Sequence, residues 1–438
     1  MAANATKSVD VNVHYVTRVE GHGNIVVNVK DGKLEKCELD IVEAPRFFEA
    51  MLLGRRWDEA SLITSRICGI CAVGHATASV LATEMAMGVK NSVQTERLRL
   101  LNVFGETLQS HVLHVYFLAA PDLLGVGSVV PLVGTHPDVV LRALKLKKLA
   151  NDLCGVISGR KVHPITMTPG GFTRIPTAAE IQGLKDRLID AIPDLDATVD
   201  LIASLASALP DFHRETEYEA LYSPDEFALY RGTKLITTDG AKVDHLDYKQ
   251  IVKERVVNHS TSKHVSNKRS SLMVGALARL NNNFAQLHPK AKEAAAKLGL
   301  KPVCTNPFFN NVAQVIECVH SAYRAVEVCD ELLAAGLKDE KPDVQVKAGR
   351  GVGITEVPRG TLVHEYVYDD RGYITDANLI IPTGQNLANI EDDFRAIVPT
   401  LLDKPQKDIA HTLEILVRAY DPCISCSVHM LDVKFVDR

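Results

Sequence analysis

Two Cys-x-x-Cys pairs stand near opposite ends of the chain. Cys68 and Cys71 lie in "RICGIC", and Cys423 and Cys426 lie in "DPCISC". Thiolates bind soft and borderline metals, and this spacing lets two sulfurs reach one centre from a single turn. The two pairs therefore supply four sulfurs for one metal site, provided that the fold brings the ends of the chain together.

Spacing alone leaves a structural zinc site, a redox metal site and coincidence open. Structural zinc modules usually have about 15–20 residues between their pairs, whereas most of this chain lies between them. A chain of 438 residues does not need a zinc ion to fold. Charged and protonatable residues flank both pairs and favour chemistry over scaffolding; they are Arg66, His75, Asp421 and His429.

The composition is that of a globular protein, with 46% hydrophobic and 24% charged residues. A net charge of −5 argues against a nucleic-acid partner. We find no apolar run of about 18 residues and no secretory signal, so no transmembrane segment is expected. Nine cysteines, an odd number, indicate a reduced, cytoplasmic protein. Five of them are expected to be small core residues: Cys37, Cys154, Cys304, Cys318 and Cys329.

The elements that must position the cysteines are mostly helical. A strand hairpin is predicted around Asp31-Gly32, followed by helices over about 57–120 that stop at Pro121. A helical hairpin broken near Pro193 is predicted over 178–210. "GRGVG" (349–353) lacks the lysine of a phosphate loop and is interpreted as a turn.

Strands are expected over about 345–386 and helices over about 388–420. No repeat or linker interrupts the pattern. The sequence therefore predicts an α+β fold, mostly helical with an N-terminal β-hairpin and small peripheral sheets. It also predicts a single interwoven catalytic domain over residues 1–438, in which the N- and C-terminal motifs meet.

Five motifs, in order along almost the whole chain, resemble those of the large subunit of nickel-iron hydrogenases. Two of them are the cysteine pairs, the second with a histidine three residues further on. The others are "TRVEGHG" (17–23), "APRFFE" (44–49), and "EVPRG" (356–360) with "NLIIPTGQN" (378–386).

The resemblance implies reversible heterolytic cleavage of H2 at a bimetallic centre. All four sulfurs would bind nickel, with Cys68 and Cys423 as terminal ligands. Cys71 and Cys426 would bridge to an iron that carries carbon monoxide and cyanide. A sulfur-rich ligand set suits redox-active nickel. The released proton would pass to Cys423 and then to Glu20, which on its own sequence context also fits a solvated carboxylate at a strand end.

The resemblance also implies a pocket for the diatomic ligands. Arg359 would donate to one cyanide and Pro358 would shape the wall, although an arginine in isolation fits an ordinary surface position equally well. Thr383 would donate to the second cyanide, at a position where family members often have serine. Asp421 is expected to pair with Arg359 or Arg66.

A second, magnesium-type site is implied near the C-terminus. Its ligands carry over as Glu49, the main-chain carbonyl of Leu379, and His429, with waters completing the shell. Glu43 is the alternative to Glu49, and a helix cap is the alternative role of His429. The nine residues after His429 are either a segment removed after nickel loading or a retained strand.

His111 and His114 lie at i, i+3 on one predicted helix face. One interpretation places them in the cleft near the metals, where the family has histidines. The other makes them core histidines whose hydrogen bonds are satisfied. The sequence does not separate the two.

The spare cysteines lack the spacing of an iron–sulfur cluster, so the resemblance implies an obligate iron–sulfur small subunit. Short length, "RICGIC" and "HSTSKH" (259–264) are most similar to the cytoplasmic multi-subunit branch. We favour the methyl-viologen-reducing type, linked to heterodisulfide reductase and the electron bifurcation of methanogens, over the F420-reducing type. Two other protein classes stay open: a non-catalytic subunit like that of complex I, and a structural zinc protein.

Overall fold

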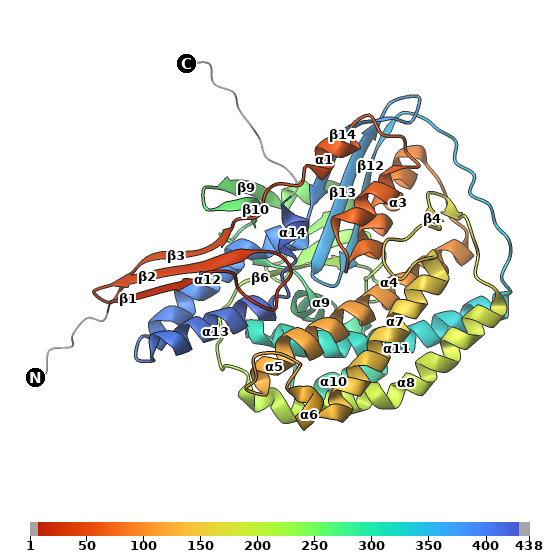
Figure 1. Cartoon of the computed structure of the whole chain (residues 1–438). Helices are drawn as coiled ribbons and strands as arrows, with labels where there is room; N and C mark the ends of the chain where they lie inside the picture. Colours follow the sequence, from red (N-terminus) through yellow and green to blue (C-terminus); the bar gives the residue numbers. More distant parts are fainter. Residues whose placement is uncertain (1–7, 429–438) are drawn as a thin grey trace, which may run out of the picture.

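The computed structural model describes residues 8–428, and it combines helices with small β-sheets as predicted (Figure 1). His429 and the segment after it lie outside the described residues. Within them, none of the helices combines the length and the apolar character needed to cross a membrane.

Long helices form one side of the molecule in Figure 1. They are α4 (Val93–Leu113), α7 (Pro137–Ser158), α8 (Ala178–Leu205) and α11 (Asn310–Ala335). α4 packs against α7 and α11, and α11 packs against α8. This arrangement places α4 in the middle of the helical layer.

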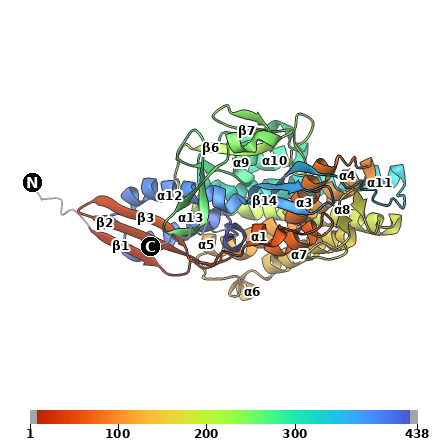
Figure 2. The same ribbon diagram turned by 90° about the horizontal axis from the view of Figure 1, so that it is seen from above.

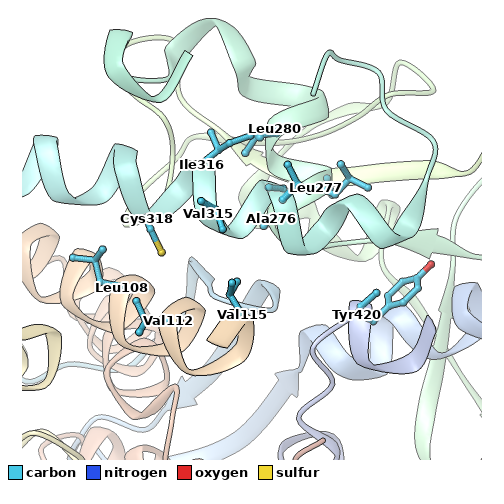
Figure 3. Close-up of a cluster of buried hydrophobic side chains, with 14 of the residues drawn as sticks. Leu108, Val112, Val115, Ala276, Leu277, Leu280, Val315, Ile316, Cys318 and Tyr420 are labelled. Atoms are coloured by element: carbon cyan, nitrogen blue, oxygen red, sulfur yellow. The ribbon is translucent and has the colours of Figure 1, made fainter. Parts of the chain in front are cut away.

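Apolar side chains fill the space between these helices. In Figure 3, Leu108 and Val112 of α4 face Val315 and Cys318 of α11. The spare cysteines Cys37, Cys154, Cys318 and Cys329 are buried, and Cys304 is half-buried, so four of the five are core residues as expected. The packing fixes α4, whose polar residues reach the cysteine pairs.

The predicted helical hairpin over 178–210 is wrong, because α8 is continuous from Ala178 to Leu205. A proline inside a helix removes one hydrogen bond and favours a kink. Here a single buried face continues on both sides of Pro193, which holds the helix together across it. Its residues are Ile181, Leu184, Leu188, Leu195, Thr198, Val199 and Ile202.

The expected helix stop at Pro121 is also imprecise. α4 ends at Leu113, and a π-helical turn (His114–Ala119) leads into α5 (Ala120–Leu123), where Pro121 occupies the first turn. Proline is tolerated there because that N–H has no helical acceptor. π-helical turns often occur at functional sites, and this one begins at His114.

A three-stranded sheet packs on helix α3 (Ala72–Met87). Its order is β12-β13-β14, with β12 (Gly349–Val357), β13 (Gly360–Tyr368) and β14 (Ile374–Ile380) antiparallel. All of α3 except Met85 is buried. The helix begins directly after Cys71, so the sheet positions the first cysteine pair.

"GRGVG" is the start of β12 and not the predicted turn. A Cβ at Gly351 or Gly353 would lie 1.9 Å from a carbonyl oxygen of α3, at Ala82 and Ala78 respectively. Two strand residues span about 6.7 Å and four helical residues about 6 Å, so alternate glycines face successive turns. The glycines therefore let a helix backbone lie directly on the strand.

The predicted hairpin around Asp31-Gly32 is confirmed as β2 (Gly23–Lys30) and β3 (Lys33–Ile41), in a sheet of order β1-β2-β3-β10-β9. Its other strands are β1 (Val9–Val13), β9 (Lys253–Val257) and β10 (Ser260–Ser266). Figure 2 shows β1–β3 extending to one side, next to α12 and α13. These are the helices expected over 388–420, α12 (Pro382–Leu401) and α13 (Gln406–Ala419).

Shorter elements complete the fold. The helices are α1 (Phe48–Leu52), α2 (Ala60–Thr64), α6 (Leu132–Thr135), α9 (Ala276–Asn283), α10 (Pro289–Lys297) and α14 (Ile424–Ser427). The strands are β4 (Met167–Thr168), β5 (Gly171–Phe172), β6 (Glu217–Tyr222), β7 (Lys234–Thr237), β8 (Lys242–Asp244) and β11 (Leu272–Met273).

Candidate metal centre

The four cysteines of the two pairs meet in the interior. The Sγ atoms of Cys68 and Cys423 are 3.5 Å apart, and those of Cys71 and Cys426 are 4.0 Å apart. All four sulfurs lie within 4.8 Å of one another and are buried. The sequence prediction that both ends of the chain build one sulfur site is thus matched by the geometry.

Backbone pairing joins the two ends. Glu20 and Cys423 form a parallel β-bridge, in which the N–H of Ile424 donates to the carbonyl of Glu20 at 2.9 Å. Gly21 has φ +87°, and a Cβ there would lie 2.6 Å from the Cβ of Ile424. Glycine is therefore required in "TRVEGHG" for both its backbone conformation and this close approach.

Arg46 connects both cysteine motifs. Its Nη1 donates to the carbonyls of Ile67 at 2.6 Å and Ser425 at 3.2 Å, and its backbone N–H donates to Val428 at 2.6 Å. Sequence reasoning quoted the motif "APRFFE" but gave this arginine no role. Its position inside a shared motif was the available signal.

The thiols form a coupled acid–base set. Hydrogen bonds from Cys423, Cys426 and Cys71 lower the pKa of Cys68 well below its usual value. Burial raises the pKa of Cys423 and of Cys426 well above the usual value. One thiolate shared among four sulfurs is the consequence, so a metal that takes all four displaces the remaining thiol protons.

Arg359 and Asp421 form a buried ion pair beside the sulfurs. Nε of Arg359 donates to the Asp421 carbonyl at 2.7 Å, and Nη2 donates to its carboxylate at 2.9 Å. Burial lowers the pKa of Arg359, but Asp421 and then the sulfurs of Cys423 and Cys71 raise it well above its usual value. Of the two expected partners of Asp421 it is therefore Arg359 that pairs with it, since Arg66 is exposed.

Thr383 lies in the first turn of α12, next to Pro382. Its hydroxyl accepts a hydrogen bond from the N–H of Cys423 at 2.9 Å. That contact uses a lone pair and leaves the hydroxyl proton for another acceptor. Thr383 thus fixes the second cysteine pair and retains one donor, as its predicted role requires.

Glu20 lies next to the second pair through its side chain as well. Its Oε2 accepts from the N–H of Ser425 at 3.1 Å, at the start of α14. The side chain is half-buried, so it is neither sealed in the core nor fully solvated. This position suits a group that exchanges protons between the interior and the surface.

Glu49 lies beside Leu379, two residues expected to share a cation. Oε1 of Glu49 accepts from the N–H of Leu379 at 2.8 Å. The alternative, Glu43, faces His22 at 2.9 Å instead. The contacts therefore favour Glu49, while the third expected ligand, His429, lies outside the described residues.

His111 and His114 are both buried and hydrogen-bonded. Nε2 of His111 lies 2.8 Å from Glu317. His114 contacts Gln314 at 2.6 Å and the carbonyl of Arg418 at 2.7 Å, and it lies 3.9 Å from Asp421. His111 therefore fits the core interpretation, whereas His114 supports the aspartate that holds Arg359.

Sequence reasoning missed Glu106 of α4. Its carboxylate accepts from the N–H groups of Val73 at 2.6 Å and Gly74 at 2.9 Å, in the first turn of α3. Burial, and then the neighbouring Cys68, raise the pKa of Glu106 to about 8. A carboxylate within the apolar run "LLNVFGETLQ" was the signal that could have identified it.

The residues present fit a nickel-iron centre. Nη1 of Arg359 is buried and has no hydrogen-bond partner in the part of the chain that the structure describes. A charged donor left open beside four sulfurs suits a centre whose own ligands accept hydrogen bonds, such as cyanide. A closed zinc–thiolate site has no use for it.

Comparison with known proteins agrees with this geometry. The model of the nickel-dependent hydrogenase family matches residues 46–132 and 215–429, more than half of the chain. A model described as HoxL-like matches residues 10–44.

Relatives match along nearly the full length. The alpha subunit of sulfhydrogenase 1 of Pyrococcus furiosus is 34% identical, covering 96% of this chain and 98% of that one. The matching subunit of the F420-non-reducing hydrogenase of Methanothermobacter marburgensis is 32% identical, covering 97% and 95%. The crystal structure of an NAD+-reducing nickel-iron hydrogenase in the H2-reduced state has a TM-score of 0.86 at 30% identity, covering 97% and 100%. The chain therefore belongs to the nickel-dependent hydrogenase family, as a catalytic large subunit that acts on H2.

Proposed function

We propose that this chain cleaves H2 heterolytically and reversibly at the four-cysteine site, and that the residues around it divide the work. The observation that carries the proposal is the meeting of four buried sulfurs within 4.8 Å, next to the open donor of Arg359. When bound, nickel and iron would supply the electrophilic centre that polarises H2 and takes up its electron pair.

The cysteines would hold the two metals unequally. Cys68 and Cys423 would bind nickel alone, and Cys71 and Cys426 would bridge nickel and iron. Soft thiolates suit both metals. The backbone supports these roles, because Cys71 precedes the first residue of α3 and Cys426 lies within α14.

The proton would leave by way of Cys423 and Glu20. A terminal thiolate is a base that lies next to the reacting hydrogen, and a carboxylate nearby relays the proton outward. The β-bridge between the two residues fixes their separation. Half-exposure of Glu20 gives the relay access toward the surface.

Arg359 and Thr383 would hold the iron's diatomic ligands, carbon monoxide and cyanide. Two nitrogens of Arg359 are anchored on Asp421, so the third is presented in a fixed orientation. Pro358 precedes it and would form the wall of the pocket. The hydroxyl proton of Thr383 would serve the second cyanide.

Glu49, the carbonyl of Leu379 and His429 would bind Mg²⁺ with several waters. A hard cation prefers carboxylate and carbonyl oxygens. The contact between Glu49 and the Leu379 main chain supports this assignment. Such a site would tie β14 and α1 to the segment that follows Cys426.

Electrons would pass to an iron–sulfur small subunit. The five spare cysteines are dispersed as free thiols and form no second cluster among the described residues. Beyond that subunit, the acceptor would be a heterodisulfide-reductase-type or F420-type module in a cytoplasmic complex. The F420-non-reducing hydrogenase among the relatives supports the former.

Infrared absorption in the carbonyl and cyanide window, combined with metal analysis, tests the proposal. A nickel-loaded complex should contain nickel and iron in equal amounts and show these bands. Zinc at one per chain with no nickel would instead indicate a structural zinc protein. A chain that binds the small subunit but has neither metals nor bands would indicate a non-catalytic subunit of the complex I type.

A further inference from the structure

Two histidines and a glutamate form a second cluster of metal-ligating side chains. His259 lies just before β10, His264 lies within β10, and Glu391 lies on α12. One ligand atom from each lies within 4.8 Å of the other two. None of the three takes part in the centre described above.

Glu391 is held in place from several directions. Its Oε1 lies 2.6 Å from Nε2 of His259 and accepts from the N–H of Leu39 at 3.1 Å. Its Oε2 accepts from Arg395 at 3.0 Å. The arginine occupies one oxygen, and the other oxygen faces the histidine.

His264 has an unused ring nitrogen in this cluster. The residue is only 2% exposed, and its buried Nε2 has no hydrogen-bond partner among residues 8–428. Its ring lies edge-on to that of His259, with centroids 5.5 Å apart. A buried nitrogen without a partner is costly, and a metal ligand bond would satisfy it.

The cluster also has an approach from solvent. His259 is one of the residues that line an open pocket of about 840 Å³, together with Asp40 and residues 254–263. Glu38 lies 3.9 Å from Nδ1 of His259 and can orient the ring from its other side. A cation can therefore enter from the pocket and find ligands that are already positioned.

We propose that His259, His264 and Glu391 bind a divalent first-row transition metal of the zinc type. Two imidazoles and one carboxylate suit Zn²⁺ and its neighbours, whereas Mg²⁺ and Ca²⁺ prefer oxygen ligands alone. Coordination replaces the hydrogen bond between His259 and Glu391, and water from the pocket completes the shell.

The metal would join two parts of the fold. His259 and His264 belong to the five-stranded sheet, and Glu391 belongs to α12. The first turn of the same helix presents Thr383 to Cys423. The proposed site thus fixes α12 against the sheet and is structural rather than catalytic.

Cobalt titration of the full-length chain, expressed without nickel, tests this proposal. Thiolate ligands give Co²⁺ an intense sulfur-to-metal charge-transfer band, and nitrogen and oxygen ligands do not. The wild-type chain should bind one equivalent of Co²⁺ beyond that which the charge-transfer band accounts for. His259→Asn should keep the band and bind the additional equivalent at least tenfold more weakly.

His288→Asn is the matched control, because His288 lies 3.2 Å from Glu327 but has no third metal-ligating residue beside it among the described residues. It should bind Co²⁺ like the wild type. His264→Asn provides a second variant, with the increase in unfolding temperature on adding Zn²⁺ as an independent readout that should shrink in both site variants. The proposal is overturned if His259→Asn binds as much Co²⁺ as the wild type, or if thiolates account for all bound cobalt.

Discussion

Arg359 donates from two of its nitrogens to Asp421, the residue two positions before Cys423. The same aspartate accepts from Gln314 at 3.0 Å and lies 3.9 Å from His114. Residues of β13's leading turn, α11 and the end of α4 thus converge on one carboxylate. The third nitrogen of Arg359 is directed by this anchoring, and the sulfur site depends on it.

Arg359→Lys should reduce H2 oxidation by about 10²-fold or more while nickel and iron stay bound, because an ammonium group cannot anchor on Asp421 and also keep a fixed free donor. Dye-linked H2 uptake and metal analysis measure the two effects. Arg350→Lys is the control, since Arg350 pairs with Glu365 at 2.5 Å at the start of β12. Unchanged turnover in Arg359→Lys would contradict the role assigned to the guanidinium.

Cys426→Ser should abolish the bimetallic centre, because a hydroxyl is a poor replacement for a thiolate that bridges two metals. Metal analysis should show loss of iron, and infrared spectra should lose the cyanide and carbonyl bands. Cys318→Ser removes a buried thiol of α11 instead and should keep both metals. Retention of full H2 uptake by Cys426→Ser would rule out the bridging assignment.

Glu20→Gln should leave the metals bound and suppress proton transfer, because an amide keeps the shape of the side chain but cannot relay a proton. Isotope exchange between H2 and D2O is the direct measurement, and it should fall by about 10²-fold or more. Glu43→Gln alters a neighbouring carboxylate that faces His22 and should exchange normally. If exchange in Glu20→Gln equals that of the wild type, the proton takes another route.

The sequence predicted the site residues better than the contacts between them. Cys68 and Cys423 could be paired in advance, because four thiolates with no other role imply one centre. Arg46 could not, since its acceptors are main-chain carbonyls at Ile67 and Ser425, and main-chain groups leave no mark in the sequence. Partner choice at such long sequence separation depends on the folded backbone.

The two element errors have a related cause. Pro193 and the glycines of "GRGVG" are local signals for a break or a turn. Packing overrode both, because α8 keeps one buried face across the proline and β12 needs a glycine face to receive α3. Neither requirement is visible in a single segment, since each arises from an element elsewhere in the chain.

Glu219→Gln should make the folded chain more stable at alkaline pH. Burial, and then repulsion from Glu356, raise the pKa of Glu219 to about 8, against 4.5 in the unfolded chain. Between these values the folded state binds more protons than the unfolded state, so the free energy of unfolding falls as pH rises from about 4.5 to 8.

The glutamine removes this contribution. Urea denaturation of chains in one metal state should therefore show a flatter pH profile for Glu219→Gln across that window, and a higher free energy of unfolding at about pH 9, on the order of a few kcal/mol. Glu35→Gln, on the exposed side of β3, should reproduce the wild-type profile. A variant whose profile keeps the wild-type slope would show that Glu219 does not titrate in this range, and the slope would then have to come from Glu106, the other buried carboxyl with a pKa raised to about 8.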